Sequence, residues 1–201
     1  LKDSISQISN CIRLSFKASG LPVPSEKQSR YVIGLGLRDT MNFLKPGIRD
    51  EEIDLVAENY RKFFLANDNP SELFPNVKAG LAELVKKNFK IAISTGKTAI
   101  GLERELRQHE LTNFFHATRC ADQDKPKPNP SMLIWLMNKL GVTRTETLMV
   151  GDTSHDILMA KSAGVDVVGV SYGAHSRSKL EASRPLEIFD ADEELFEWVL
   201  N

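Results

Sequence analysis

The first part of the chain carries the hydrophobic periodicity of helices. Apolar residues recur three and four positions apart in two segments, a spacing that predicts amphipathic helices. The first stripe is formed by Ile5, Ile8, Ile12 and Phe16, and the second by Ile53, Val56, Ala57, Tyr60, Phe63 and Phe64. Residues 67–70, Asn-Asp-Asn-Pro, are typical of a linker. We therefore expect a small helical module in this part of the chain.

Start signals support these helices. Ser4 with Gln7 and Ser25 with Gln28 have the spacing of capping boxes. Asp50 stands where a cap for the later stripe is needed.

A different pattern begins at Val77, where short apolar runs alternate with helical stripes. Strands are predicted over 89–95, 114–118, 147–150 and 165–170, and helices over 97–109, 131–140 and 157–163. This alternation is typical of an α/β fold with a parallel sheet. The chain is thus expected to combine a helical module with an α/β core.

Composition excludes several classes of protein. The chain has 201 residues, with 26 Lys and Arg against 27 Asp and Glu and a net charge of −1. The balance and the absence of a basic run argue against nucleic-acid and membrane-surface partners. No apolar run approaches the ~18 residues of a membrane span, and the polar start has no signal-peptide core. Cys11 and Cys120, without metal spacing, fit a reduced cytoplasmic protein.

Candidate chemistry follows the predicted strands, because ligands bind beyond the carboxyl ends of parallel strands. Thr95 and Gly96 follow one strand, where they fit either an ordinary helix cap or a phosphate site. Lys125 lies in the run Asp-Lys-Pro-Lys-Pro-Asn-Pro, whose prolines hold the backbone extended. A rigid loop of this kind is either a solvated turn or a support that aims Lys125 at a phosphate.

A pair of carboxylates follows the strand at 147–150. Asp152 and Asp156 belong to the run Gly-Asp-Thr-Ser-His-Asp. The simpler interpretation is that Asp152 caps a helix while Asp156 faces solvent. Two like charges at one sheet edge otherwise favour a bound cation, and Mg²⁺ prefers such oxygen ligands. Together with Thr95 and Lys125, the pair predicts a metal-assisted phosphate site.

These motifs resemble those of the haloacid dehalogenase superfamily, in its phosphoglycolate phosphatase-like branch. Thr95 matches motif II of the family, Lys125 the motif III lysine, and Asp152 with Asp156 the Gly-Asp-x-x-x-Asp form of motif IV. The runs 74–77, Phe-Pro-Asn-Val, and 170–173, Val-Ser-Tyr-Gly, resemble further family segments. The resemblance implies a Rossmann-like core at 76–201 with a small helical cap at 5–75.

The resemblance departs at motif I. Residues 1–4 match only the tail of that motif, so its nucleophilic aspartate and its acid/base aspartate are not in the sequence. Asp3 is interpreted as a local cap. The strand carrying motif I lies in the middle of the family's sheet, and its loss would leave two neighbouring strands without ladder partners. We therefore expect roughly ten further residues before Leu1, and a chain that begins at Leu1 to be inactive.

The resemblance implies a Mg²⁺-dependent phosphatase that works through an aspartyl-phosphate. Thr95, Gly96 and Lys125 would bind the phosphoryl group, Asp152 would hold the metal directly, and Asp156 would assist through water or by orientation. The expected substrate is a small phosphorylated metabolite such as 2-phosphoglycolate, and the expected assembly is a monomer or homodimer. A pyrophosphatase or another phosphoester hydrolase is the alternative within the family. A non-catalytic module that binds a phospho-ligand or a protein is the alternative of another class.

Two further features stay open at the level of sequence. Arg38 lies in the cap after Gly34 and Gly36, where it fits a substrate carboxylate or an ordinary exposed turn. His155 lies inside motif IV and is interpreted as a loop residue, since the histidines lack zinc spacing.

Overall fold

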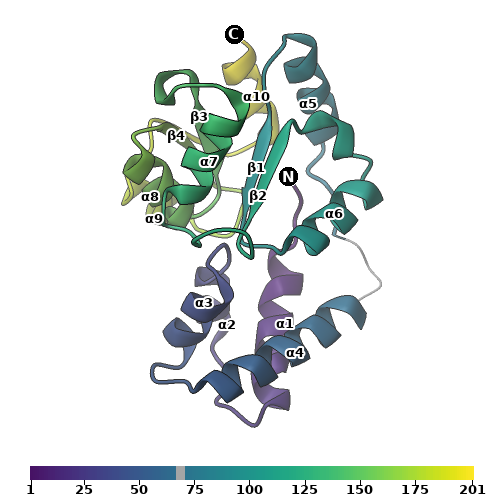
Figure 1. Ribbon diagram of the computed structural model, residues 1–201, viewed down its shortest axis with the longest axis vertical. Helices are drawn as coiled ribbons and strands as arrows, with labels where there is room; N and C mark the ends of the chain where they lie inside the picture. The colour runs from purple at the N-terminus through teal and green to yellow at the C-terminus, as the bar shows by residue number, and fades with distance from the viewer. Residues whose placement is uncertain (67–70) are drawn as a thin grey trace. The chain divides into compact units, whose positions relative to one another are not determined.

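The computed structural model describes residues 1–66 and 71–201, and the linker expected at 67–70 lies outside them. The chain divides into two compact units, Lys2–Glu72 and Leu73–Asn201, with Leu1 belonging to the second. The first, the cap unit, is helical; the second, the core unit, is α/β (Figure 1). The division falls three residues before the boundary expected from the sequence.

The cap unit consists of helices around one apolar cluster. The helices are α1 (Ile5–Ala18), α2 (Glu26–Tyr31), α3 (Leu37–Leu44) and α4 (Asp50–Ala66). Phe16 of α1, Met41 of α3 and Val56 of α4 are almost fully buried in this cluster. The stripes that predict α1 and α4 therefore face each other, whereas α3 has no counterpart in the sequence pattern.

One of the two predicted capping boxes forms. The Ser25 side chain accepts the N–H of Gln28, and the Gln28 side chain accepts the N–H of Ser25. The box predicted at Ser4 is wrong: Ser4 makes no side-chain cap, and Oε1 of Gln7 accepts the Ser71 hydroxyl at 2.8 Å. Oδ1 of Asp3 accepts the Ile5 N–H at 3.4 Å, as expected of a local cap.

The core unit alternates strands and helices, as predicted. The strands are β1 (Ala92–Thr95), β2 (Ala117–Cys120), β3 (Leu148–Gly151), β4 (Asp166–Val170) and β5 (Ile188–Phe189). The helices are α5 (Val77–Lys86), α6 (Ala99–Gln108), α7 (Ser131–Leu140), α8 (Ser154–Ala163), α9 (Arg177–Glu181) and α10 (Asp192–Leu200), with short 3-10 turns at Thr112–Phe114 and Arg144–Glu146. The strand predicted at 114–118 begins only at Ala117, because Thr112–Phe114 forms a 3-10 turn.

The strands form two parallel groups. β1 pairs with β2, with Thr95 beside Cys120, and β3 pairs with β4, which in turn pairs with β5. Among the described residues no ladder joins β1 to β3. Helix α7 packs on β1 and β2 and against α8, which covers β3 and β4, so these two helices form one layer over both groups. The carboxyl ends of β1 and β3 are thereby held in one unit.

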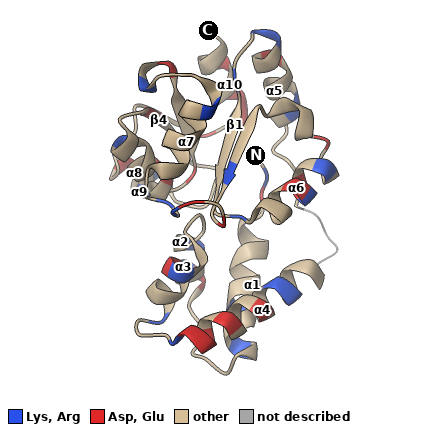
Figure 2. Cartoon of the chain, viewed as in Figure 1, with Lys and Arg blue, Asp and Glu red and all other residues tan. Residues whose placement is uncertain are grey.

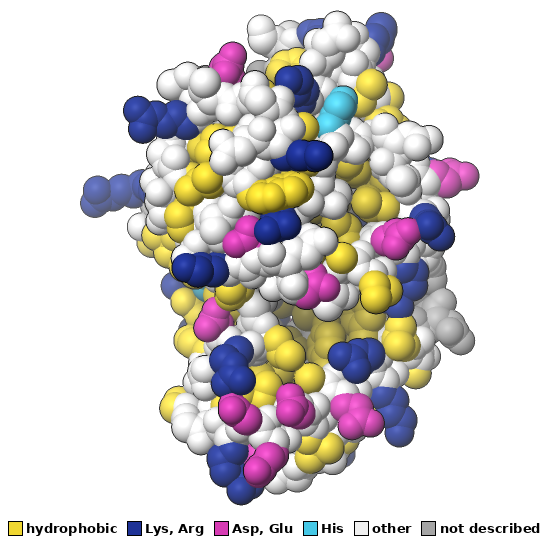
Figure 3. Space-filling view, in the orientation of Figure 1, with side chains coloured by type: hydrophobic (Ala, Val, Ile, Leu, Met, Phe, Trp, Pro, Cys, Tyr) yellow, Lys and Arg dark blue, Asp and Glu magenta, His cyan; other side chains and the backbone are white. Residues whose placement is uncertain are grey.

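Charges of both signs are mixed over the described surface (Figure 2). Acidic and basic side chains are interspersed in both units (Figure 2), and the face drawn in Figure 3 has no continuous field of one sign. Within the part of the chain that the structure describes, no helix has the length and apolar character needed to cross a membrane.

Glu52 gives a pH-dependent test of the cap unit. The N–H of Arg49 first, and then the Lys45 ammonium, lower the pKa of Glu52 to about 2. A carboxyl with such a depressed folded-state pKa stabilises the fold above its unfolded-state value of about 4.3 and loses that contribution as the pH falls. We expect Glu52→Gln to lower the urea midpoint at neutral pH, and this difference to shrink as the pH is lowered below about 4.

Glu51→Gln is the matched control, because the Glu51 side chain is 86% exposed beside the same arginine. It should show no comparable pH-dependent difference. A Glu52→Gln difference that stays constant from neutral pH to pH 3 would contradict the assignment.

Candidate active site

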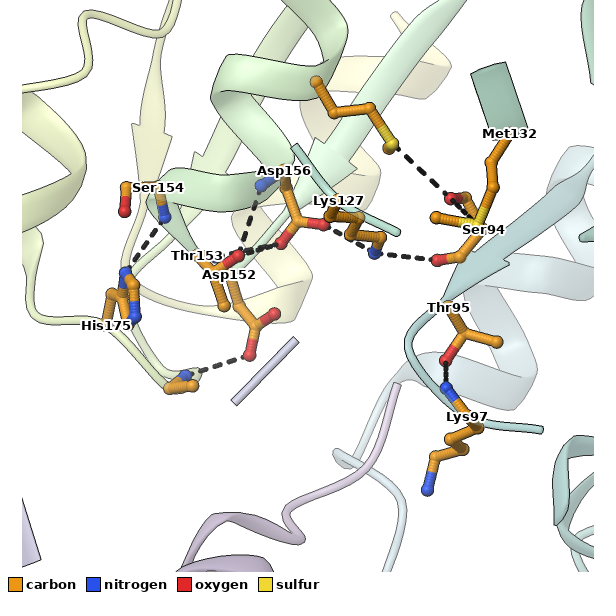
Figure 4. Close-up of polar contacts among 12 residues, drawn as sticks. Ser94, Thr95, Lys97, Lys127, Met132, Asp152, Thr153, Ser154, Asp156 and His175 are labelled. Carbon is orange, nitrogen blue, oxygen red and sulfur yellow. Dashed lines mark hydrogen bonds and ion pairs between the residues drawn. The ribbon is translucent and has the colours of Figure 1, made fainter. Parts of the chain in front are cut away.

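A buried lysine bridges the ends of β1 and β3. Nζ of Lys127 donates to Oδ1 of Asp156 at 2.7 Å and to the backbone carbonyl of Ser94 at 2.9 Å. Ser94 belongs to β1, and Asp156 lies in the first turn of α8, directly after β3 (Figure 4). Lys127 is only 6% exposed. One ammonium group therefore connects the two groups of strands at their carboxyl ends.

The lysine in this position is Lys127 and not Lys125, the residue predicted from the sequence. Lys125 is exposed, and its backbone N–H donates to Oδ1 of Asp124 at 2.8 Å. Each lysine begins a Lys-Pro-x-Pro run, so the motif alone fits both. Only the second run leads directly into α7, which begins at Ser131. The distance from lysine to helix is the sequence signal that separates them.

Both oxygens of the Asp156 carboxylate are engaged. Oδ1 accepts from Lys127, and Oδ2 accepts the Thr153 N–H at 3.0 Å and its hydroxyl at 2.7 Å. Burial by itself would raise the pKa of Asp156, but the Lys127 ammonium and these hydrogen bonds outweigh it and lower the pKa. Asp156 is thus a buried, ionised carboxylate, and the alternative that it faces solvent is wrong.

Asp152 has a less compensated environment. Its Oδ2 accepts the Ala174 N–H at 2.9 Å, and within the described residues no hydrogen bond reaches Oδ1. Burial first, and then the charge of Asp156, raise the pKa of Asp152. Backbone packs closely on this side chain, since a Cβ on Gly173 would lie 2.1 Å from the Asp152 Cβ. The site therefore holds one carboxylate with both oxygens engaged and one that accepts a single hydrogen bond within the described residues.

Thr95 ends β1 and lies across the site from Asp152 (Figure 4), and Gly96 follows it in the chain. The Thr95 hydroxyl oxygen accepts the Lys97 N–H at 3.2 Å, which leaves its own hydrogen available to a ligand. These residues do not open helix α6. That helix begins at Ala99, whose N–H donates to the Asp122 carboxylate, and the N–H of Gly101 donates to the Thr98 hydroxyl. An anion at Thr95 would meet the turn and not the helix N-terminus.

Arg38 belongs to the cap unit. Its guanidinium donates to Oδ1 of Asp50 at 2.7 Å, and its side chain is 65% exposed. An exposed pair of this kind contributes little to stability and leaves Arg38 able to exchange partners. A substrate role for Arg38 therefore stays a prediction.

The donor set suits a hard cation only in part. Among the described residues no group of three or more His, Cys, Asp or Glu side chains could hold a metal ion. Oδ1 of Asp152 is the available protein oxygen, since Asp156 is engaged on both sides. Mg²⁺ commonly takes one or two protein carboxylates and completes its shell with water and substrate oxygens. Asp152 thus fits a direct ligand, and Asp156 a group that holds the site in shape.

Three comparisons place this geometry among known proteins. The family model described as haloacid dehalogenase-like hydrolase matches residues 1–170. The probable phosphatase IndB of Dickeya dadantii is 32% identical over 97% of this chain and 87% of its own length. A phosphoglycolate phosphatase of Vibrio parahaemolyticus is 33% identical over 99% of this chain and 91% of its own. A hydrolase from Pseudomonas syringae shares the fold, with a TM-score of 0.91 at 22% identity over 99% of this chain and 93% of its own.

The two lysines of the loop can be told apart by stability. Lys127→Ala leaves the buried Asp156 carboxylate without its counter-charge, and we expect the free energy of unfolding to fall by about 3–5 kcal/mol. Lys125→Ala removes an exposed side chain and should change it by no more than about 0.5 kcal/mol. Urea unfolding of both variants is the measurement. Equal effects, or a larger effect at Lys125, would contradict the assignment of Lys127.

Gly173 offers a test of the packing around Asp152. An added methyl group at Gly173 would overlap the Asp152 side chain, so Gly173→Ala should cost about 1–3 kcal/mol of unfolding free energy. Gly101→Ala is the control, because a Cβ there meets only the Thr98 hydroxyl oxygen, at 3.1 Å. Thermal unfolding should place the control within a degree or two of the unaltered chain. Similar unfolding midpoints for both variants would contradict the close packing of Gly173 against the Asp152 side chain.

Proposed function

Because the chain belongs to the haloacid dehalogenase-like hydrolases, we propose that it is a magnesium-dependent phosphatase of a small phosphorylated metabolite. The observation that carries the proposal is the buried Lys127 ammonium held between Ser94 and Asp156. This ammonium links the end of β1, which carries Thr95, to the segment after β3, which carries both carboxylates. A phosphatase needs such a fixed positive charge beside a polar cradle.

In this proposal the phosphoryl group binds between the carboxyl end of β1 and the loop that follows β2. The Thr95 hydroxyl and the Gly96 N–H donate to one phosphoryl oxygen. The Lys127 ammonium stabilises a second oxygen and the attacking carboxylate. Its pairing with Asp156 fixes the ammonium in place before substrate arrives, so little reorganisation is needed during the reaction.

Asp152 would hold Mg²⁺ directly, and Asp156 would assist through water or by orienting Lys127. Mg²⁺, when bound, supplies positive charge that offsets the repulsion between an anionic nucleophile and an anionic phosphate. The raised pKa of Asp152 supports this assignment, because a nearby cation would favour its ionised form.

We assign the attacking aspartate to a strand between β1 and β3, carried by residues that precede Leu1. The two strands belong to separate ladders, and Val150, in the interior of β3, is 40% exposed. An added parallel strand would pair with both and bring its carboxyl end to Lys127. Its aspartate would form an aspartyl-phosphate, and a second aspartate would protonate the leaving alcohol and activate water. A chain that begins at Leu1 would then bind phosphate without turning it over.

The relatives support a proposal for the substrate class. One of them is a phosphoglycolate phosphatase, 33% identical over 99% of this chain. A small anionic phosphomonoester of the 2-phosphoglycolate type is therefore the substrate we propose, with Arg38 as a candidate for its carboxylate. Pyrophosphate and other phosphoesters are the alternatives that a substrate panel separates.

The test is phosphate release from a panel of phosphorylated metabolites, with and without Mg²⁺. It uses the chain that begins at Leu1 and, beside it, a longer protein that carries the proposed aspartate-bearing strand before Leu1. We expect Mg²⁺-dependent release by the longer protein and none by the chain that begins at Leu1. Thr95→Ala should lower kcat/KM about 10²-fold and Lys127→Ala about 10³-fold or more, because each removes a donor to the phosphoryl group.

Lys125→Ala serves as the control and should retain activity. Release by the chain that begins at Leu1 would overturn the assignment of the nucleophile. Binding of phosphate without release by the longer protein would favour a non-catalytic module.

A further inference from the structure

Two buried histidines adjoin the carboxylates and have no part in the proposed chemistry. His155 is 6% exposed and His175 is 4% exposed, and their rings meet edge to face with centroids 5.1 Å apart. His155 lies in the first turn of α8 and is buried there, so its interpretation as a loop residue is wrong. His175 follows β4. Imidazole groups are seldom buried this deeply without a polar partner.

Two hydrogen bonds join His175 to the segment 152–154, which carries Asp152 and the start of α8. The ring Nδ1 of His175 accepts the N–H of Ser154 at 3.0 Å (Figure 4). Its backbone N–H donates to the carbonyl of Asp152 at 3.0 Å. The preceding Ala174 donates its N–H to the Asp152 carboxylate. The segment 173–175 thus contacts both the side chain and the backbone of Asp152. It also accepts a hydrogen bond from the backbone of Ser154, two residues after Asp152 in the chain.

The contact to Ser154 depends on the imidazole itself. Ser154 is the first residue of α8, and Thr153, the N-cap, is occupied with the N–H of Asp156. Ser154 is buried, and the acceptor of its N–H is the imidazole of His175, which lies 21 positions later in the chain. The backbone contacts of 174 and 175 would survive a change of side chain, but this one would not.

We propose that His175 is a positioning residue that sets the direction of the Asp152 carboxylate by holding the backbone at Ser154. This inference rests on the proposed function, since Asp152 is there the direct ligand of Mg²⁺. Because Nδ1 accepts a hydrogen bond, the ring carries its proton on Nε2. Groups that orient a metal ligand typically change metal affinity by 10- to 100-fold when removed.

The test compares His175→Leu, which has no acceptor, with His175→Asn, whose amide oxygen can stand in for Nδ1. Two properties are measured in the chain as it stands: binding of Mn²⁺, used as a probe for Mg²⁺, by electron paramagnetic resonance, and hydrogen exchange of the Ser154 amide without metal. We expect His175→Leu to weaken Mn²⁺ binding about tenfold or more and to speed the exchange. His175→Asn should restore most of both.

His116→Leu is the matched control, because Nδ1 of His116 also accepts a backbone N–H, that of Ile91 at 3.2 Å. It removes the same kind of bond at the start of β1 and should leave Mn²⁺ binding unchanged. Mn²⁺ binding by His175→Leu equal to that of the unaltered chain would overturn the positioning role alone. Failure of the unaltered chain to bind Mn²⁺ would overturn the metal site and this role together. Slow Ser154 exchange in His175→Leu would contradict the hydrogen bond itself.

Discussion

The contact between Lys127 and Asp156 is the interaction on which the rest of the site depends. Both side chains are buried, and two opposite charges removed from water are stable only when further hydrogen bonds satisfy them. The Ser94 carbonyl does so for the ammonium, and Thr153 does so for the carboxylate. The pair therefore fixes β1, the loop after β2 and the start of α8 relative to one another. The strands alone do not achieve this, because no ladder joins β1 to β3 in the described residues.

The second carboxylate, Asp152, lies in an environment that shifts its pKa in the opposite direction. Asp152 lies in the same buried edge but has less compensation, and its pKa is raised where that of Asp156 is lowered. Glycine backbone approaches both side chains: a Cβ on Gly151 would lie 2.2 Å from that of Asp156, and one on Gly173 would lie 2.1 Å from that of Asp152. The Asp156 carboxylate is thus paired with Lys127, whereas the Asp152 carboxylate accepts one hydrogen bond within the described residues. This division suits a site that binds a cation and an anion together.

The sequence predicts the α/β class, the order of the main elements and the edge of the sheet at which the polar residues meet. Helix α7 has its predicted bounds because its ends are marked by Pro130 and Gly141 in the sequence itself. The choice between Lys125 and Lys127 could not be made from the motif, which both satisfy; it depends on which side chain the loop turns inward. The contact of His175 with Ser154 was equally out of reach, since no local pattern encodes a bond between a turn after β4 and a helix start after β3.

A double-mutant cycle on Lys127→Met and Asp156→Asn tests the central claim most directly, because it isolates the energy of the pair from the cost of each change. We predict that each single variant is strongly destabilised and that the double variant is less destabilised than the sum of the two. The coupling free energy from urea unfolding should be at least about 1 kcal/mol. The same cycle with Lys125→Met should give a coupling near zero. Additive effects for Lys127 and Asp156 would contradict the account, since the two groups would then not depend on each other.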